Sequence, residues 1–263
     1  MKSKKTVATS IVSLLLAGCI TEGGIEENPV ALEDAARTNV QMGMTYLNDG
    51  RVELARAKLL KAVELYPSLP EAQNALAFLY QSTGDFDSAD EHYRIALKLD
   101  PDSGIFLNYY GVFLCLRGEH KKADRYFMKA ADIQQYRTPW VAYSNAGSCA
   151  NRAENTEKAE EYYRRALAYN PRYPDALLPM ARITYDKGDY LQARAFLQRH
   201  SVLVRPGPVA LLLCVKVENE LGDSQAAYTC SSELRNLYPG SQQTRELMEN
   251  LELTEKVAES DGP

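Results

Sequence analysis

A 34-residue repeat is the feature of this sequence that most constrains its fold. Six units follow one another, and a small residue, or a valine in the sixth unit, recurs at one position: Gly43, Ala77, Gly111, Gly147, Ala181 and Val215. An alanine follows each of them after twelve residues: Ala55, Ala89, Ala123, Ala159, Ala193 and Ala227. A unit of this length cannot bury its apolar face alone, so neighbouring units must stack. The sequence therefore predicts a solenoid.

The residue types within each unit predict two antiparallel helices. Helices approach each other closely only where side chains are small, which explains the glycine and alanine positions. A proline ends units one, two, four and six, because proline cannot continue a helix: Pro67, Pro101, Pro171 and Pro239. This pattern resembles the tetratricopeptide repeat (TPR) family. The resemblance implies an all-α fold, a right-handed TPR superhelix of about six helix-turn-helix repeats with a C-terminal capping helix.

The phase of the repeat sets the expected boundaries. A TPR domain is expected over 32–253, with repeats at about 36–69, 70–103, 104–139, 140–173, 174–207 and 208–240 and a cap at 241–253. Residues 254–263 are expected to be a disordered tail. Unit three has Gln135 in place of the proline, followed by a two-residue insertion, and unit five has His200 in place of an alanine. Unit five also has Arg205 in place of its proline, and we expect a slight bend or looser stacking near residues 135–140 and 203–208.

The N-terminus predicts a lipoprotein signal peptide over residues 1–18. Three of the first five residues are lysines, and an uncharged apolar run follows over 7–16. That run is too short to cross a bilayer, which needs roughly 20 residues, and it is typical of a secretory signal. Leu16-Ala17-Gly18-Cys19 resembles the lipobox of bacterial lipoproteins, which implies cleavage before Cys19 and acylation of its thiol. The alternative is an ordinary secreted protein with a chance cysteine there.

A lipidated Cys19 would anchor the mature chain to a membrane. The next residue is Ile20 rather than aspartate, which by the usual sorting rule for such lipoproteins indicates the outer membrane. The segment 19–31 is polar and contains glycine, so we expect a flexible tether between the lipid and the repeats. The expected location is the periplasmic face of the outer membrane.

The four remaining cysteines suggest two disulfides, because a secreted chain meets an oxidising compartment. Cys115 and Cys149 lie at nearly the same height on the first helices of adjacent units, so they could bridge the two units. Cys214 and Cys230 lie on the two helices of unit six and could bridge within it. The alternative is four buried free thiols.

The sequence shows no catalytic constellation, and we predict that the chain is not an enzyme. The three histidines, His92, His120 and His200, fall in different units, and none pairs with a cysteine or carboxylate at metal-ligand spacing. We therefore expect no metal, no cofactor and no small-molecule substrate. With 30 basic and 35 acidic residues the net charge is −5, which argues against nucleic-acid binding.

A partner-binding groove is expected on the first helices of units one to three. The residues predicted to point into it are Val40, Met44, Leu47, Asn74, Phe78, Ile105, Asn108 and Val112. Exposed apolar residues over such an area are typical of a protein partner site. Asn74 and Asn108 could hydrogen-bond a peptide backbone, and the lack of a Lys/Arg run disfavours a carboxylate clamp. Neighbouring helices or the tether could instead cover these residues.

Two segments resemble one family more specifically than the general repeat does. They are LNYYGVFL at residues 107–114 and LYPGS at residues 237–241, and both are similar to segments of the type IV pilus pilotin family, PilW/PilF. The resemblance runs from Cys19 to about Tyr238. It implies a monomeric outer-membrane pilotin that binds secretin subunits and promotes their outer-membrane localisation and multimerisation in pilus biogenesis and twitching motility.

Two other functions stay open from the sequence. One is a TPR scaffold lipoprotein for a different envelope assembly, such as a tight-adherence pilus or a cell-wall synthesis complex. The other is an accessory subunit that modulates an enzyme.

Overall fold

The computed structural model describes residues 29–250, and within this range the chain is helical and has no strand. The helices are α1 (Pro29–Asn48), α2 (Val52–Leu65), α3 (Pro70–Thr83), α4 (Phe86–Leu99), α5 (Gly104–Leu116), α6 (His120–Asp132), α7 (Pro139–Arg152), α8 (Thr156–Tyr169), α9 (Pro174–Asp186), α10 (Tyr190–Leu203), α11 (Pro208–Glu220) and α12 (Ser224–Leu237). Residues 242–250 are also helical. The predicted all-α TPR superhelix is confirmed. The expected signal peptide, Cys19 and the expected tail lie outside the described residues.

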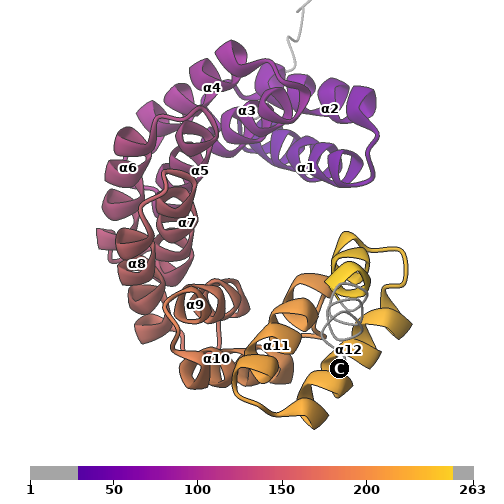
Figure 1. The fold of residues 1–263 in the computed structure, drawn as a ribbon. Coiled ribbons are helices and arrows are strands. Elements are labelled where there is room, and N and C mark those ends of the chain that lie inside the picture. Colours follow the sequence, from indigo (N-terminus) through magenta and orange to yellow (C-terminus); the bar gives the residue numbers. More distant parts are fainter. Residues whose placement is uncertain (1–28, 251–263) are drawn as a thin grey trace, which may run out of the picture.

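The helices pair into a C-shaped arc (Figure 1). Each odd-numbered helix packs against the even-numbered helix that follows it, and contacts also join α1 to α3, α5 to α7 and α9 to α11. The odd-numbered helices lie on the inner side of the arc and the even-numbered helices on its outer side (Figure 1). We call the inner side, formed by α1, α3, α5, α7, α9 and α11, the concave surface.

The glycines of the repeat mark the points where two helices of a unit touch. A Cβ atom on Gly43 would lie 2.7 Å from the side chain of Leu59, and one on Gly147 would lie 2.8 Å from the ring of Tyr163. Real Cβ atoms do not come this close to their neighbours, so a larger residue at either position would push the helices apart. The small-residue positions of the sequence are therefore the helix-crossing points of the structure.

Gly111→Ala is expected to lower the free energy of unfolding by about 1–3 kcal/mol, because the new methyl group overpacks the crossing of α5 and α6. Its Cβ would lie 2.7 Å from the ring of Phe127, which is fully buried. Gly207→Ala is the matched control, since no atom of the described residues lies within 4 Å of a Cβ there. Urea unfolding followed by circular dichroism should separate the two variants. Equal midpoints would contradict the overpacking argument.

Turn and capping residues set where the even-numbered helices begin. Gly84 ends α3 with a positive φ of 82°, which glycine adopts without steric cost. The next residue, Asp85, accepts a hydrogen bond from the backbone N–H of Ser88 and caps α4. Unit four lacks the turn glycine, and Glu154 takes the positive φ, 57°, at that turn. The helix boundaries therefore follow from the local sequence.

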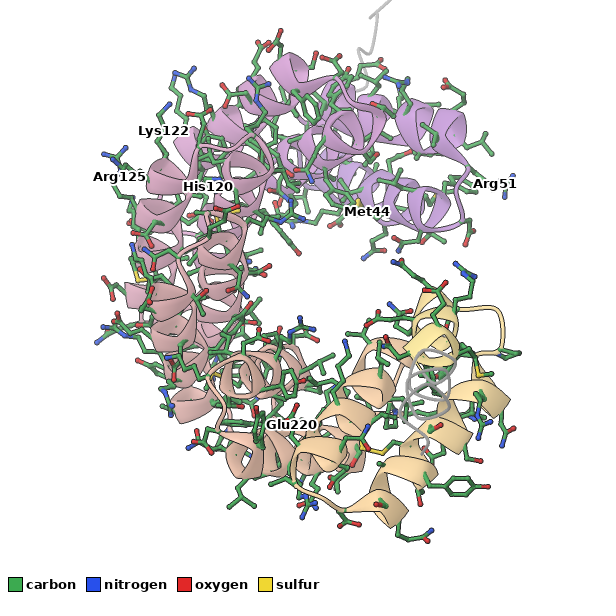
Figure 2. The ribbon with its side chains drawn as sticks, viewed as in Figure 1. Met44, Arg51, His120, Lys122, Arg125 and Glu220 are labelled. Carbon is green, nitrogen blue, oxygen red and sulfur yellow. A yellow bond between two sulfur atoms is a disulfide. The ribbon has the colours of Figure 1, made fainter. Side chains whose placement is uncertain are left out.

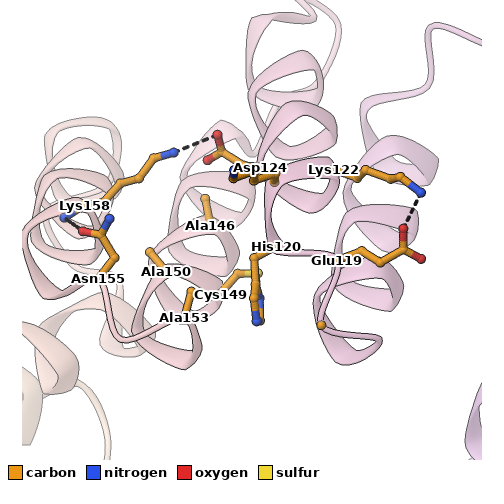
Figure 3. A pocket seen from close by; sticks show the side chains of 12 residues that line it. Glu119, His120, Lys122, Asp124, Ala146, Cys149, Ala150, Ala153, Asn155 and Lys158 are labelled. Atoms are coloured by element: carbon orange, nitrogen blue, oxygen red, sulfur yellow. Dashed lines mark hydrogen bonds and ion pairs between the residues drawn. The ribbon is translucent and has the colours of Figure 1, made fainter.

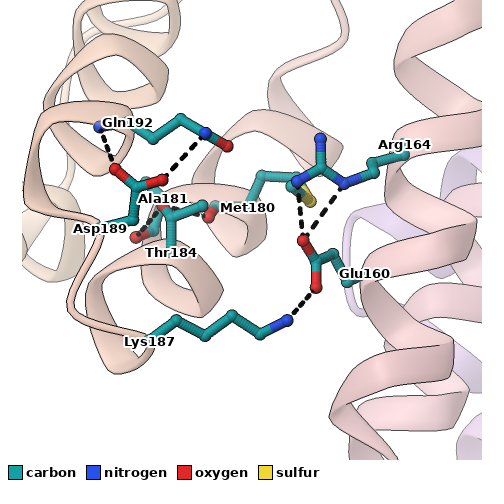
Figure 4. A network of polar contacts seen from close by, with 8 residues as sticks. All are labelled: Glu160, Arg164, Met180, Ala181, Thr184, Lys187, Asp189 and Gln192. Carbon is teal, nitrogen blue, oxygen red and sulfur yellow. Dashed lines mark hydrogen bonds and ion pairs between the residues drawn. The ribbon is translucent and has the colours of Figure 1, made fainter.

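Polar contacts join neighbouring repeats on the lower half of the arc. The Glu160 carboxylate on α8 accepts hydrogen bonds from Lys187, which follows α9, and from Arg164 (Figure 4). Lys187, and then Arg164, lower the pKa of Glu160 from its ordinary value. Farther on, Arg194 of α10 pairs with Glu218 of α11, which is only 5% exposed, and with Asp223. These contacts fix the stacking of units four to six.

The helical residues 242–250 close the C-terminal end of the apolar core. Leu247 is buried against Leu211, Leu212, Val215 and Leu234. Thr244 donates a hydrogen bond from its hydroxyl to the Tyr238 carbonyl oxygen at 2.7 Å. Met248 is 40% exposed and takes no part in that cluster. None of the helices within residues 29–250 is both long enough and apolar enough to cross a membrane.

Stability is expected to fall as the pH drops below about 6.5, partly because of His200. Its side chain is buried, its Nδ1 atom has no hydrogen-bond partner among residues 29–250, and burial lowers its pKa. Between the pKa of His200 in the folded chain and its higher pKa in the unfolded chain, the folded state binds fewer protons than the unfolded state. Acid therefore favours unfolding. Urea midpoints at pH 7.5 and 5.5 measure the loss. His200→Leu should reduce the difference between these two midpoints. An unchanged difference would show that His200 does not contribute to the loss. Burial lowers the pKa of His92 as well, so His92 should contribute to the loss in the same direction.

Candidate partner-binding surface

The eight residues predicted to line a groove all come from the first three inner helices. Val40, Met44 and Leu47 lie on α1, Asn74 and Phe78 on α3, and Ile105, Asn108 and Val112 on α5. Met44 lies on the inner side of the arc (Figure 2). Their placement on one succession of inner helices follows from the 34-residue period, which brings equivalent positions to the same face.

Neighbouring helices cover much of the expected apolar area. Val40, Met44 and Leu47 are half-buried and pack against the cluster that contains Leu59 and Leu76. Val112 packs against the main core, and Phe78 is half-buried. Ile105 differs, because it is 52% exposed. The exposed apolar area on the concave surface is therefore smaller than the sequence predicted, since the side chains of α1 also fill the space between α1 and α3.

The two asparagines have different surroundings. Asn108 is only 4% exposed, and its Oδ1 accepts a hydrogen bond from Asn145 Nδ2 on α7 at 3.0 Å. Its predicted availability to a peptide backbone is wrong, because this side chain already joins α5 to α7. Asn74 Oδ1 is buried and has no hydrogen-bond partner within the described chain. A buried acceptor without a donor costs free energy, and its burial keeps this oxygen out of contact with the groove.

An ion pair that sequence reasoning missed lies one helical turn from Asn74. Arg37 of α1 donates to Glu71 of α3 at 2.6 Å and to Glu33 at 2.8 Å. The second oxygen of Glu71, Oε2, is buried and, like Asn74 Oδ1, has no partner in the part of the chain that the structure describes. The 34-residue separation of Arg37 and Glu71 was the only sequence signal that could have found the pair. The Arg37–Glu71 pair joins α1 to α3 on the inner side of the arc.

Both cysteine pairs suggested by the sequence are bonded. Cys115–Cys149 joins α5 to α7, and Cys214–Cys230 joins α11 to α12. The first bond fixes two neighbouring inner helices, and it lies at the end of α5 opposite to Ile105. The structure therefore has two disulfides rather than four buried free thiols.

One histidine prediction is wrong. The sequence indicated that no histidine pairs with a cysteine, yet His120 Nδ1 lies 3.5 Å from Cys149 Sγ and 3.9 Å from Cys115 Sγ. His120 is the first residue of α6, so the turn after α5 brings it back toward Cys115. Cys149 belongs to the next repeat and reaches both residues only through the stacking of units three and four. A linear spacing rule could not detect this cluster.

Comparison with known proteins agrees with the architecture. Tetratricopeptide repeat models match residues 36–69, 70–103 and 150–201. The type IV pilus assembly protein PilF of Pseudomonas aeruginosa is 31% identical over 248 residues, which are 92% of this chain and 98% of that protein. This chain belongs to the PilF/PilW family of TPR proteins. The family that its LNYYGVFL and LYPGS segments resemble is thus confirmed.

Solved structures of family members superpose on most of the arc. A structure of Pseudomonas aeruginosa PilF matches with a TM-score of 0.74 and 29% identity over 84% of this chain and 99% of that one. A crystal structure of PilW, described as a widely conserved type IV pilus biogenesis factor, matches with a TM-score of 0.71 and 30% identity over 81% and 98%. The whole repeat array is therefore shared within the family.

Proposed function

We propose that this chain is an outer-membrane lipoprotein of the pilotin type, which acts as a monomer on the periplasmic face in type IV pilus biogenesis. It binds secretin subunits and promotes their localisation and multimerisation in the outer membrane. The observation that carries the proposal is the match to PilF over 92% of this chain and 98% of that protein. A relationship over both full lengths favours a shared role more than a shared repeat type does.

The sequence supports the anchor and the structure supports the partner site. Acylation of Cys19 would hold the repeats at the membrane and raise the local concentration of a bound secretin subunit. Ile105 lies exposed on the inner helix α5, which also carries the half-buried Val112. An exposed apolar side chain on the inner surface suits contact with an apolar peptide or helix.

The state of the secretin in a strain that lacks this gene tests the function. We expect denaturant-resistant secretin multimers to disappear from the outer-membrane fraction, to return with the wild-type gene, and not to return with Cys19→Ala. Normal multimers in the deletion strain would refute the pilotin role. They would leave a scaffold for another envelope assembly as the alternative.

Ile105→Lys tests the partner surface, and we expect it to weaken secretin capture at least about tenfold, because a buried apolar contact becomes a charge to be desolvated. Leu191→Lys is the matched control, since Leu191 is 69% exposed on α10, an outer helix. Pull-down of secretin by each purified variant, with circular dichroism to verify folding, gives the readout. Equal capture by both variants would move the binding site away from the concave surface.

A further inference from the structure

Three side chains with metal-binding atoms meet where α5, α6 and α7 come together. Cys115 lies in the last turn of α5, His120 begins α6, and Cys149 lies on α7. The two sulfur atoms and a ring nitrogen lie within 4.8 Å of one another. The proposed pilotin function uses none of these atoms, and nothing in the partner surface depends on His120.

The distances within this cluster fit a tetrahedral metal site. Zinc binds sulfur at about 2.3 Å and nitrogen at about 2.0–2.1 Å, which places the ligand atoms of a tetrahedral site about 3.5–3.8 Å from each other. His120 Nδ1 lies 3.5 Å from Cys149 Sγ and 3.9 Å from Cys115 Sγ. The distance to Cys149 lies within this range and the distance to Cys115 lies slightly above it, whereas the two sulfur atoms are bonded and would have to separate.

A cleft gives an ion access to the cluster. His120 and Cys149 line a cleft of about 680 Å³ between α6, α7 and α8 (Figure 3). Both sulfur atoms belong to buried residues, whereas His120 is half-buried at the cleft wall. Both acidic side chains of the lining are already paired, Asp124 with Lys158 and Glu119 with Lys122. The protein thus offers three ligands, and the cleft has room for water as the fourth.

We propose that the dithiol form of this chain binds one zinc-like divalent ion through Cys115, His120 and Cys149. The chain has this form before the disulfide forms, or after a dithiol reductant has supplied two electrons and two protons and has itself become a disulfide. Binding of the ion then releases two protons from the thiols and leaves two metal-bound thiolates. The ion joins α5 to α7 in place of the disulfide, so the disulfide and the metal site exclude each other.

Cobalt(II) is the probe for this site, because its thiolate complexes absorb light. The purified full-length chain is reduced with a phosphine without oxygen and titrated with Co²⁺, and Zn²⁺ is then added. We expect one equivalent of Co²⁺ to give a thiolate charge-transfer band and tetrahedral visible bands, both removed by Zn²⁺. The oxidised chain should show neither.

Variants identify the ligands. His120→Ala should weaken Co²⁺ binding at least about tenfold, whereas His92→Ala, the matched control on α4, should not change it. Cys115→Ala/Cys149→Ala should abolish the bands, and Cys214→Ala/Cys230→Ala should keep them. The proposal is overturned if the reduced wild type gives no thiolate band, if His120→Ala binds as tightly as wild type, or if the bands persist without Cys115 and Cys149. None of these outcomes bears on secretin binding, so the metal site and the pilotin role are tested independently.

Discussion

Phe127→Ala is expected to lower the free energy of unfolding by about 3–5 kcal/mol, because the lost ring leaves a cavity that a rigid helix crossing cannot close. Phe127 is fully buried on α6 and belongs to the main apolar core together with Phe113 and Tyr163. Its ring lies directly against the backbone of Gly111 on the inner helix α5. Urea unfolding monitored by circular dichroism gives the measurement. Tyr228→Ala is the control, since Tyr228 is 62% exposed on α12, and it should change stability by less than about 0.5 kcal/mol.

The pairing of Phe127 with Gly111 makes a stronger test than either residue alone. In the wild type a methyl group on Gly111 would meet the ring at 2.7 Å, whereas in Phe127→Ala it would enter the empty space. Gly111→Ala should therefore change from destabilising to stabilising in the Phe127→Ala background, since alanine also favours the helix by roughly 0.5–1 kcal/mol over glycine. A double-mutant cycle measures the coupling. Additive effects would show that the two positions do not share the crossing.

The sequence could predict the array because its repeat encodes the helix crossings directly. Gly43, Gly111 and Gly147 each lie under a large side chain of the partner helix, so their spacing is a physical constraint on where the helices touch. The apolar period likewise identifies the inner helices. The repeat also placed Cys115 and Cys149 at nearly the same height on adjacent inner helices, since they are 34 residues apart where equivalent positions, Gly111 and Gly147, are 36 apart.

The details of the surface could not be predicted, because they depend on how adjacent units stack. Asn108 looked exposed from its helical position, but Asn145 of the next repeat covers it and donates a hydrogen bond to it. That partner lies 37 residues away rather than 34, beyond the two-residue insertion that follows Gln135. The same stacking brings Cys149 to His120. A periodic pattern fixes which face a residue occupies and leaves open what the neighbouring unit places over it.

Removing the disulfide between units three and four should also cause a large loss of stability. Cys115→Ala/Cys149→Ala is expected to lower the free energy of unfolding by about 3–4 kcal/mol, because the bond closes a loop of 34 residues in the unfolded chain. The loss of this disulfide should also make the unfolding transition less cooperative. Stability in a solenoid is carried by contacts between adjacent units, and this bond strengthens one such interface. Urea unfolding in the presence of a chelator, which removes any bound metal ion, measures both the midpoint and the steepness of the transition.

Trp140 makes the location of this effect observable, since it is the single tryptophan of the chain and lies at the start of α7. In Cys115→Ala/Cys149→Ala its fluorescence transition should move to lower urea. Cys214→Ala/Cys230→Ala is the matched control, because it removes a bond that closes a shorter loop, 16 residues, within the last unit. That variant should lose a comparable free energy in circular dichroism, about 3 kcal/mol, with a smaller shift of the Trp140 transition. If both variants move the Trp140 transition equally, the array unfolds as one cooperative unit, and the bond between α5 and α7 has no special role in coupling its two halves.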